Sequence, residues 1–190
     1  MKKIVLMTLL AGSTFFAAQA QITIKPTAGL NFSDFSQDAN GEAKAKVGYQ
    51  FGGSVAFGKK WYIEPGFYWV GKSTEFISST TTNPKLNIDL KGIRIPLTLG
   101  VKLLGSKSFG LRAFGGASAF FITSDGGFPP SIDINKSNFG VFAGAGVNIW
   151  KIFVDLSYEW SVTDIQKNVD QVDFGKTRSI FINTGIRINL

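Results

Sequence analysis

The chain has 190 residues and a formal net charge of +7, and it contains neither cysteine nor histidine. Without cysteine there are no disulfides, thiolate metal sites or thiol nucleophiles, and without histidine there is no nucleophile activated by a Ser–His pair. The positive charge suits an anionic partner such as lipid or lipopolysaccharide, and equally suits scattered solvated lysines. The sequence has no basic cluster that would indicate binding to nucleic acid.

The first twenty residues are predicted to be a secretory signal peptide. Lys2 and Lys3 precede a short apolar run, Ile4–Phe16, and Ala18-Gln19-Ala20 forms a small-x-small cleavage site. Cleavage after Ala20 leaves a mature domain of residues 21–190. The alternative, a retained helical anchor, is disfavoured because the run is too short and wrongly flanked. No lipoprotein anchor is expected, since no cysteine follows the run.

The mature chain alternates between apolar residues and small, polar or charged ones. In the last segment, Ile180, Ile182 and Ile186 fall on one side, and Asn183 and Arg187 fall on the other. A period of two predicts strands with two unlike faces. Eight strands are predicted, over residues 22–32, 47–57, 61–72, 86–103, 109–122, 138–149, 152–162 and 178–190.

Two local irregularities are expected within these strands. The apolar parity of the fourth strand changes near Lys91-Gly92, which predicts a β-bulge there. Pro26, Pro65 and Pro96 each remove a ladder donor from a strand interior. A closed barrel offers no edge strand to accommodate them, so bulges or skipped hydrogen bonds are expected at the prolines.

The connections between strands alternate in length. Tight joins at 58–60, 104–108 and 150–151 alternate with connections of a dozen residues or more at 33–46, 73–85, 123–137 and 163–177. In an up-and-down meander, all short turns then lie at one rim and all long loops at the other. Bacterial outer-membrane barrels have this arrangement, with the long loops outside the cell.

The two predicted faces differ completely in charge. The face taken as outward carries no charged residue within the strands, and no later segment has the roughly 18 apolar residues of a helical span. A membrane chain of this kind must close a barrel to satisfy its backbone. The predicted fold is all-β: an eight-stranded antiparallel up-and-down transmembrane β-barrel. The alternative is a soluble sandwich with the aromatic residues as its core.

Aromatic residues of the outward face are expected to form two girdles at the membrane–water interfaces. The candidates at the short-turn rim are Phe57, Trp61, Phe109 and Trp150, and those at the long-loop rim include Trp69, Phe121 and Trp160.

The inward charges are the candidate site. They form a predicted lumen network of Lys25, Glu64, Arg94, Arg112, Asp155, Glu159 and Arg187. Asp155 is expected to pair with Arg187 on the adjacent strand, Glu64 with Arg94 or Arg112, and Glu159 with a neighbouring lysine or arginine. Glycines and aromatic rings on the same face predict a filled interior. The network is interpreted as structural; a proton or ion path is the alternative.

Several segments resemble the PorT-like small outer-membrane β-barrel family of the Bacteroidota. They are YIEPGFYW (62–69), IRIPLTLGVK (93–102), LRAFGGASAFF (111–121), FGVFAGAGVNI (139–149) and FINTGIRINL (181–190). The chain departs from the usual pattern by ending on Leu190 instead of an aromatic residue. The resemblance implies a barrel fold and an outer-membrane location, and it implies no common activity.

No catalytic, cofactor or metal site is predicted. The loop carboxylates Asp164, Asp170 and Asp173 could bind calcium, but their spacing matches no calcium loop. The leading hypothesis is a non-enzymatic outer-membrane barrel with a structural or binding role. Its long external loops, including Phe128-Pro129-Pro130, would contact another outer-membrane or surface protein. The alternatives are an accessory subunit of an export or assembly complex, a narrow permeation protein, and an outer-membrane enzyme.

Overall fold

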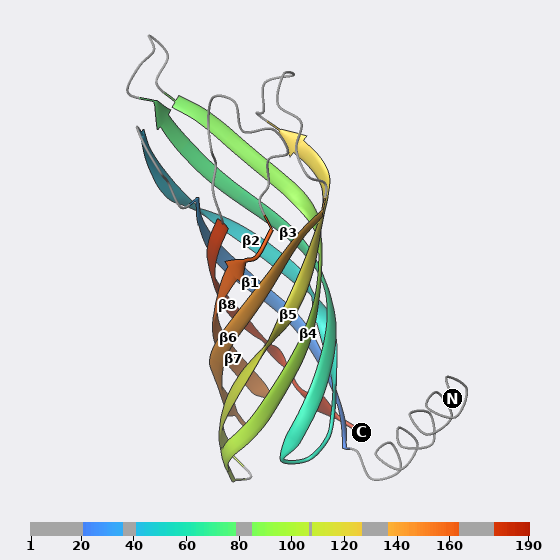
Figure 1. Ribbon diagram of the computed structural model, residues 1–190. Helices are drawn as coiled ribbons and strands as arrows, with labels where there is room; N and C mark the ends of the chain where they lie inside the picture. The colour runs from blue at the N-terminus through green and yellow to red at the C-terminus, as the bar shows by residue number, and fades with distance from the viewer. Residues whose placement is uncertain (1–20, 36–40, 79–84, 107, 127–136, 164–176) are drawn as a thin grey trace, which may run out of the picture.

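A single antiparallel sheet closes on itself in the computed structural model, which describes residues 21–35, 41–78, 85–106, 108–126, 137–163 and 177–190. The strands are β1 (Ile22–Phe35), β2 (Gly41–Phe57), β3 (Trp61–Ser78), β4 (Lys85–Gly105), β5 (Phe109–Gly126), β6 (Ser137–Ile149), β7 (Ile152–Ser161), β8 (Thr177–Ile186) and β9 (Ile188–Asn189). Neighbours in sequence pair in order, and β1 pairs with both β2 and β8 (Figure 1). β9 continues β8 along β1, so β8 and β9 count as one interrupted strand of the barrel. The predicted eight-stranded barrel is therefore confirmed. Among the described residues, no helix is long and apolar enough to cross a membrane.

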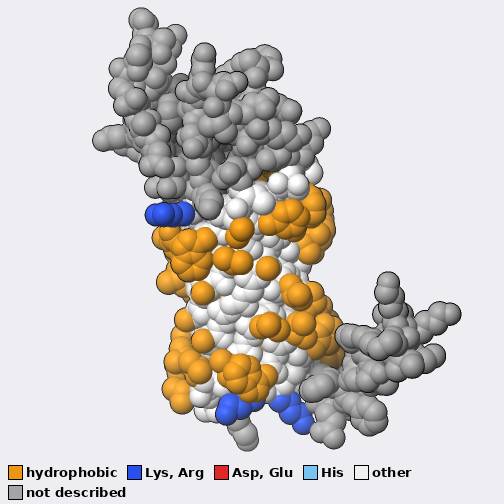
Figure 2. Space-filling view, in the orientation of Figure 1, with side chains coloured by type: hydrophobic (Ala, Val, Ile, Leu, Met, Phe, Trp, Pro, Cys, Tyr) orange, Lys and Arg blue, Asp and Glu red, His pale blue; other side chains and the backbone are white. Residues whose placement is uncertain are grey.

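Apolar side chains cover the outside of the barrel (Figure 2). Trp61 is 73% exposed and Leu99 62%, whereas Arg94 and Arg112 are each 4% exposed. This distribution is the reverse of that in a water-soluble protein and matches an apolar band facing lipid. The structure therefore excludes the soluble sandwich with an aromatic core.

The outer face is not entirely free of charge, which corrects the sequence prediction. Lys91 on β4 and Arg178 on β8 are both exposed. Arg178 pairs with Trp160, and Lys91 lies two residues beyond Ile93, the partner of Trp69. Both cations thus lie at the long-loop end beside aromatic residues, where the penalty for a charge on the lipid side falls to about 0–1 kcal/mol.

The three strand prolines lie at or beside gaps in the hydrogen-bonded ladders, as expected. β1 pairs with β9 at Ile24 and with β8 from Thr27, and the ladder is missing between them, where Pro26 lies. Because proline has no N–H, the last strand divides there into β8 and β9. Pro65 and Pro96 border similar gaps in the β2–β3 and β3–β4 ladders.

The irregularity predicted near Lys91-Gly92 is present, but its extra residue belongs to the neighbouring strand. Lys91 pairs with Ser124 and Gly92 pairs with Ile122, which leaves Thr123 of β5 unpaired. The Thr123 hydroxyl donates to the Lys91 carbonyl at 3.1 Å. Since β4 pairs with β3 without a break at this point, the parity change on β4 located the bulge correctly and assigned it to the wrong strand.

Strands extend into segments that were predicted to be loops. β2 begins at Gly41, β3 continues to Ser78 and β5 continues to Gly126. These ends pair with one another, for example Gly41 with Ser78, so β2 to β5 project beyond the shorter strands β6, β7 and β8 (Figure 1). We call this projection, residues 41–45, 74–78, 85–89 and 124–126, the raised wall. Strands can continue past the apolar band because backbone pairing alone needs no apolar face.

A charge placed on the outer face tests the membrane assignment. Leu97→Arg, at mid-height of β4, is expected to lower the free energy of unfolding in phospholipid vesicles by about 2–4 kcal/mol, because the cation enters the hydrocarbon layer. Leu104→Arg, on the same strand at the short-turn end, should cost about 0–1 kcal/mol. Urea titration measures both. Equal costs at the two positions would contradict the proposed depth.

Candidate functional site in the barrel lumen

Alternate strands each place one charged side chain at the centre of the lumen. Lys25 comes from β1, Glu64 from β3, Arg112 from β5 and Asp155 from β7. Each lies at an inward position of its strand, between outward apolar neighbours. Alternate strands bring inward side chains to comparable heights in a small barrel, so four such residues can meet across it.

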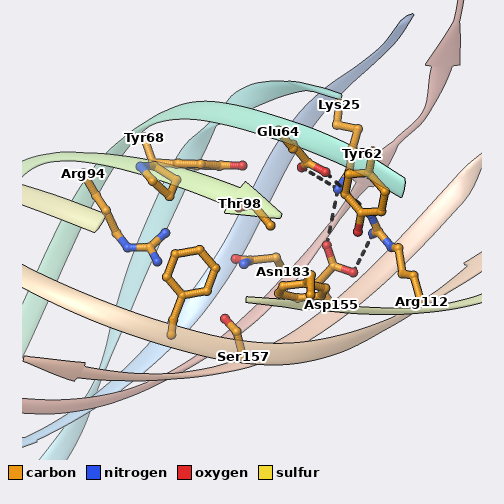
Figure 3. Close-up of a pocket in the computed structure, with 13 residues that line it drawn as sticks. Lys25, Tyr62, Glu64, Tyr68, Arg94, Thr98, Arg112, Asp155, Ser157 and Asn183 are labelled. Atoms are coloured by element: carbon orange, nitrogen blue, oxygen red, sulfur yellow. Dashed lines mark hydrogen bonds and ion pairs between the residues drawn. The ribbon is translucent and has the colours of Figure 1, made fainter. Parts of the chain in front are cut away.

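These four residues form a closed ring of alternating charge, the charge ring (Figure 3). Lys25 Nζ lies 2.7 Å from Glu64 Oε1 and 3.5 Å from Asp155 Oδ2. Arg112 reaches Asp155 Oδ1 at 2.5 Å and Glu64 Oε2 at 3.9 Å. Their side chains are 4–10% exposed. Each charge therefore has two opposite neighbours, which offsets the loss of hydration on burial.

Glycines make room for the charge ring, and aromatic side chains pack against it. A side chain at Gly146 would collide with Asp155 and Arg112, and one at Gly100 would collide with the Tyr62 ring. Lys25 Nζ lies 4.3 Å from the centroid of the Phe153 ring, so this ring also stabilises the ammonium group. The glycines of the lumen face are required for space, as the sequence predicted for a filled interior.

A second ion pair lies nearer the long-loop end. Arg94 on β4 donates through Nε to Glu159 Oε2 of β7 at 2.9 Å, and Ser118 donates to the same oxygen at 2.8 Å. The Arg94 guanidinium also lies over the Phe181 ring, 4.6 Å from its centroid. Glu159 thus has an arginine partner, as expected, although the arginine reaches it across the lumen and not from a neighbouring strand.

One of the expected pairings is wrong, and another is confirmed with a closer partner beside it. Asp155 lies opposite Asn183 on β8, whereas Arg187 lies four residues farther along the chain, beyond the end of that strand. Asp155 bonds Lys25 and Arg112 instead, so the Asp155–Arg187 pair is wrong. For Glu64, the expected Arg112 is present at 3.9 Å, but Lys25 is much closer. The prediction for Asp155 was wrong because it assumed a partner on the adjacent strand, whereas the lumen is narrow enough for side chains to reach across it.

Lys72 and Tyr62 belong to the same interior, although they were not in the predicted network. Lys72 Nζ lies 4.9 Å from the centroid of the Phe120 ring and 3.3 Å from the Ser179 hydroxyl. Tyr62 lines the lumen beside Arg112 (Figure 3). Both lie at inward positions of β3, where strand parity places them.

The predicted interface aromatics all lie on the outer surface. Phe57, Trp61, Phe109 and Trp150 are exposed near the short turns, and Trp69, Phe121 and Trp160 are exposed toward the other end. On β2 and β3, Trp69 stacks on Phe51, with ring centroids 5.7 Å apart. The loop predictions at Phe128-Pro129-Pro130 and at Asp164, Asp170 and Asp173 lie outside the described residues, as does the signal peptide.

Side chains nearly fill the lumen where it is described. One cavity beside the charge ring has a volume of about 40 Å³, room for little more than water. No group of three His, Cys, Asp or Glu side chains converges among the described residues. The arrangement is that of a membrane-spanning barrel whose interior is closed by its own side chains.

Comparison with known proteins agrees with this class. Residues 17–167 match the family described as the outer membrane protein beta-barrel domain, and the chain belongs to that family. No curated protein matches it. The fold is similar to that of OprG from Pseudomonas aeruginosa, with a TM-score of 0.56, 14% identity, and coverage of 90% of this chain and 94% of that one. Ail of Yersinia pestis, in complex with the heparin analogue sucrose octasulfate, gives a TM-score of 0.48 at 16% identity, with coverage of 88% and 99%.

Breaking the charge ring should strongly destabilise the barrel. Arg112→Met is expected to lower the free energy of unfolding by about 3–5 kcal/mol, because Asp155 and Glu64 lose a buried partner. The double variant Arg112→Met, Asp155→Leu should recover much of that loss, since it removes both charges. Lys151→Met, at an exposed turn, is the control. Urea unfolding in vesicles measures all three, and an Arg112→Met effect no larger than the control would contradict the role of the ring.

Proposed function

We propose that this protein is a non-conducting, non-enzymatic barrel of the bacterial outer membrane that acts through the parts it displays outside. In this proposal the signal peptide is cleaved after Ala20, and the exposed aromatics anchor the barrel in lipid and lipopolysaccharide. The sequence resemblance further supports membership of the PorT-like group. The role is structural or one of binding to another outer-membrane or surface protein.

The single observation that carries the proposal is the closed lumen. The charge ring crosses the barrel from four alternate strands, and Arg94 with Glu159 crosses it again farther along. The cavities next to the ring have volumes of about 40 and 20 Å³. A hydrated ion or a small solute needs a continuous path wider than one water molecule, so this interior favours a rigid support over a pore.

The raised wall supports a binding role. The described pairings join Gly41–Ala45 of β2 to β3, whereas β1 pairs with β2 only from Lys46 onward. The other side of Gly41–Ala45 therefore has no strand partner among the described pairings. An unpaired strand edge offers N–H and C=O groups to an incoming strand of another protein. An accessory subunit of an outer-membrane complex would use the same edge.

Conductance tests the closed lumen. The wild-type protein in planar bilayers is expected to give no stable current steps, because the charge ring blocks the path. The quadruple variant Glu64→Ala, Arg94→Ala, Arg112→Ala, Glu159→Ala removes opposite charges from both crossings of the lumen, and small steps should then appear. Those steps would also show that the protein inserts under the conditions used. Stable steps from the wild type would favour the alternative of a narrow permeation protein.

Photo-crosslinking tests the external role. A photoreactive residue at Ala43, on the raised wall, is expected to give a protein adduct in native membranes. The matched control at Ala28, on the exposed lipid side of β1, should give lipid adducts instead. Mass spectrometry of the adduct would distinguish a surface partner from an export or assembly complex. Absence of a protein adduct at Ala43 would count against a binding role for this edge.

A further inference from the structure

The short-turn end of the lumen carries more positive than negative charge. Lys25, Lys102, Arg112 and Arg187 line one small cavity there together with Glu64, and Asp155 lies beside it in the charge ring. The ring itself is neutral, because two cations face two carboxylates. Lys102 and Arg187 remain, which gives an excess of two positive charges (four cations against two carboxylates). Neither of these two forms an ion pair or side-chain hydrogen bond with the described part of the chain.

The same cavity is lined by buried polar atoms without partners. Arg112 Nε and Asn148 Oδ1 have no hydrogen-bond partner among the described residues. The Tyr62 hydroxyl lies beside the Arg112 guanidinium, which can only donate to it, so the proton of that hydroxyl has no acceptor among the same residues. Tyr62 and Asn148 are 6% exposed and Arg112 is 4% exposed. Tyr62 and Arg112 present donors, and the amide of Asn148 offers a donor when its two ends are exchanged. Buried donors without an acceptor are costly, so they indicate a missing partner.

The missing partner must be an acceptor with negative charge. A water molecule would satisfy the donors and leave the excess charge unbalanced. The volume of the cavity is about 20 Å³, which accommodates one particle of about the size of water. This size favours a single-atom anion over a phosphate or a carboxylate-bearing ligand. Glu64 also lines the cavity, but Lys25 and Arg112 already neutralise it.

We propose that this cavity is a binding site for one chloride-sized inorganic anion. The Arg112 Nε and Tyr62 hydroxyl donors hold the ion from the inner side. Lys102 and Arg187, both half-buried, supply charge from the side of the short turns. Arg187 can take this position because it lies between β8 and β9, outside the ladder interrupted at Pro26. The site is independent of whether the raised wall binds a partner.

Thermal unfolding in a non-ionic detergent tests this site, with sodium chloride compared with sodium gluconate at constant ionic strength. Chloride is expected to raise the wild-type midpoint saturably, whereas gluconate is too large to enter. Arg187→Gln and Lys102→Gln should each weaken the apparent chloride affinity about tenfold or more, as for the loss of a charged donor. Lys59→Gln, at an exposed turn of the same end, should keep the wild-type response.

The salt dependence separates an ion site from a purely structural role. In gluconate, Arg187→Gln should unfold at the wild-type midpoint or above it, because it removes an uncompensated charge. Broadening of the chloride-35 NMR line by the wild type, and its loss in Arg187→Gln, is the second expected result. The proposal is overturned if chloride and gluconate act alike on the wild type, if Arg187→Gln keeps the chloride response, or if it lowers the midpoint equally in both salts.

Discussion

Every backbone N–H and C=O group that lies in lipid must find its partner within the protein, and this constraint determines the rest of the structure. A sheet meets it by closing, which here requires β1 to pair with β2 on one side and with β8 on the other. Closure then assigns opposite chemistry to the two faces. Leucine, isoleucine and tryptophan face outward, and the charged residues are enclosed in a space just wide enough for side chains.

Enclosure turns the lumen charges into mutual partners. In so narrow a barrel a lysine on β1 and an arginine on β5 both reach the same aspartate on β7, so alternate strands are linked through the middle as well as around the wall. Any single member is costly to lose, because its neighbours cannot regain water. A lumen closed in this way gives rigid support to the raised wall, which we propose as the part that binds partners.

Strand parity predicted the fold and the inward position of Glu64, Arg94 and Asp155, because a period of two separates the faces before any pairing is known. It could not predict which inward charges meet. Arg187 follows the strand next to Asp155, but it lies four residues beyond Asn183, the partner of Asp155, and past the end of β8. The bulge was similarly located at Lys91 but belongs to Thr123, since a register shift is a property of two strands. The extensions of β2, β3 and β5 into the raised wall were missed because these segments carry few apolar residues, and backbone pairing does not require them.

The gap at Pro26 has a consequence for how the barrel shuts. The gap lies in the junction between the first and last strands, whose pairing closes the barrel. Near the short turns, this junction has fewer main-chain hydrogen bonds than an uninterrupted strand would supply. We therefore expect the barrel to open first at this junction under thermal or mechanical stress. Arg187 lies at this junction, between β8 and β9.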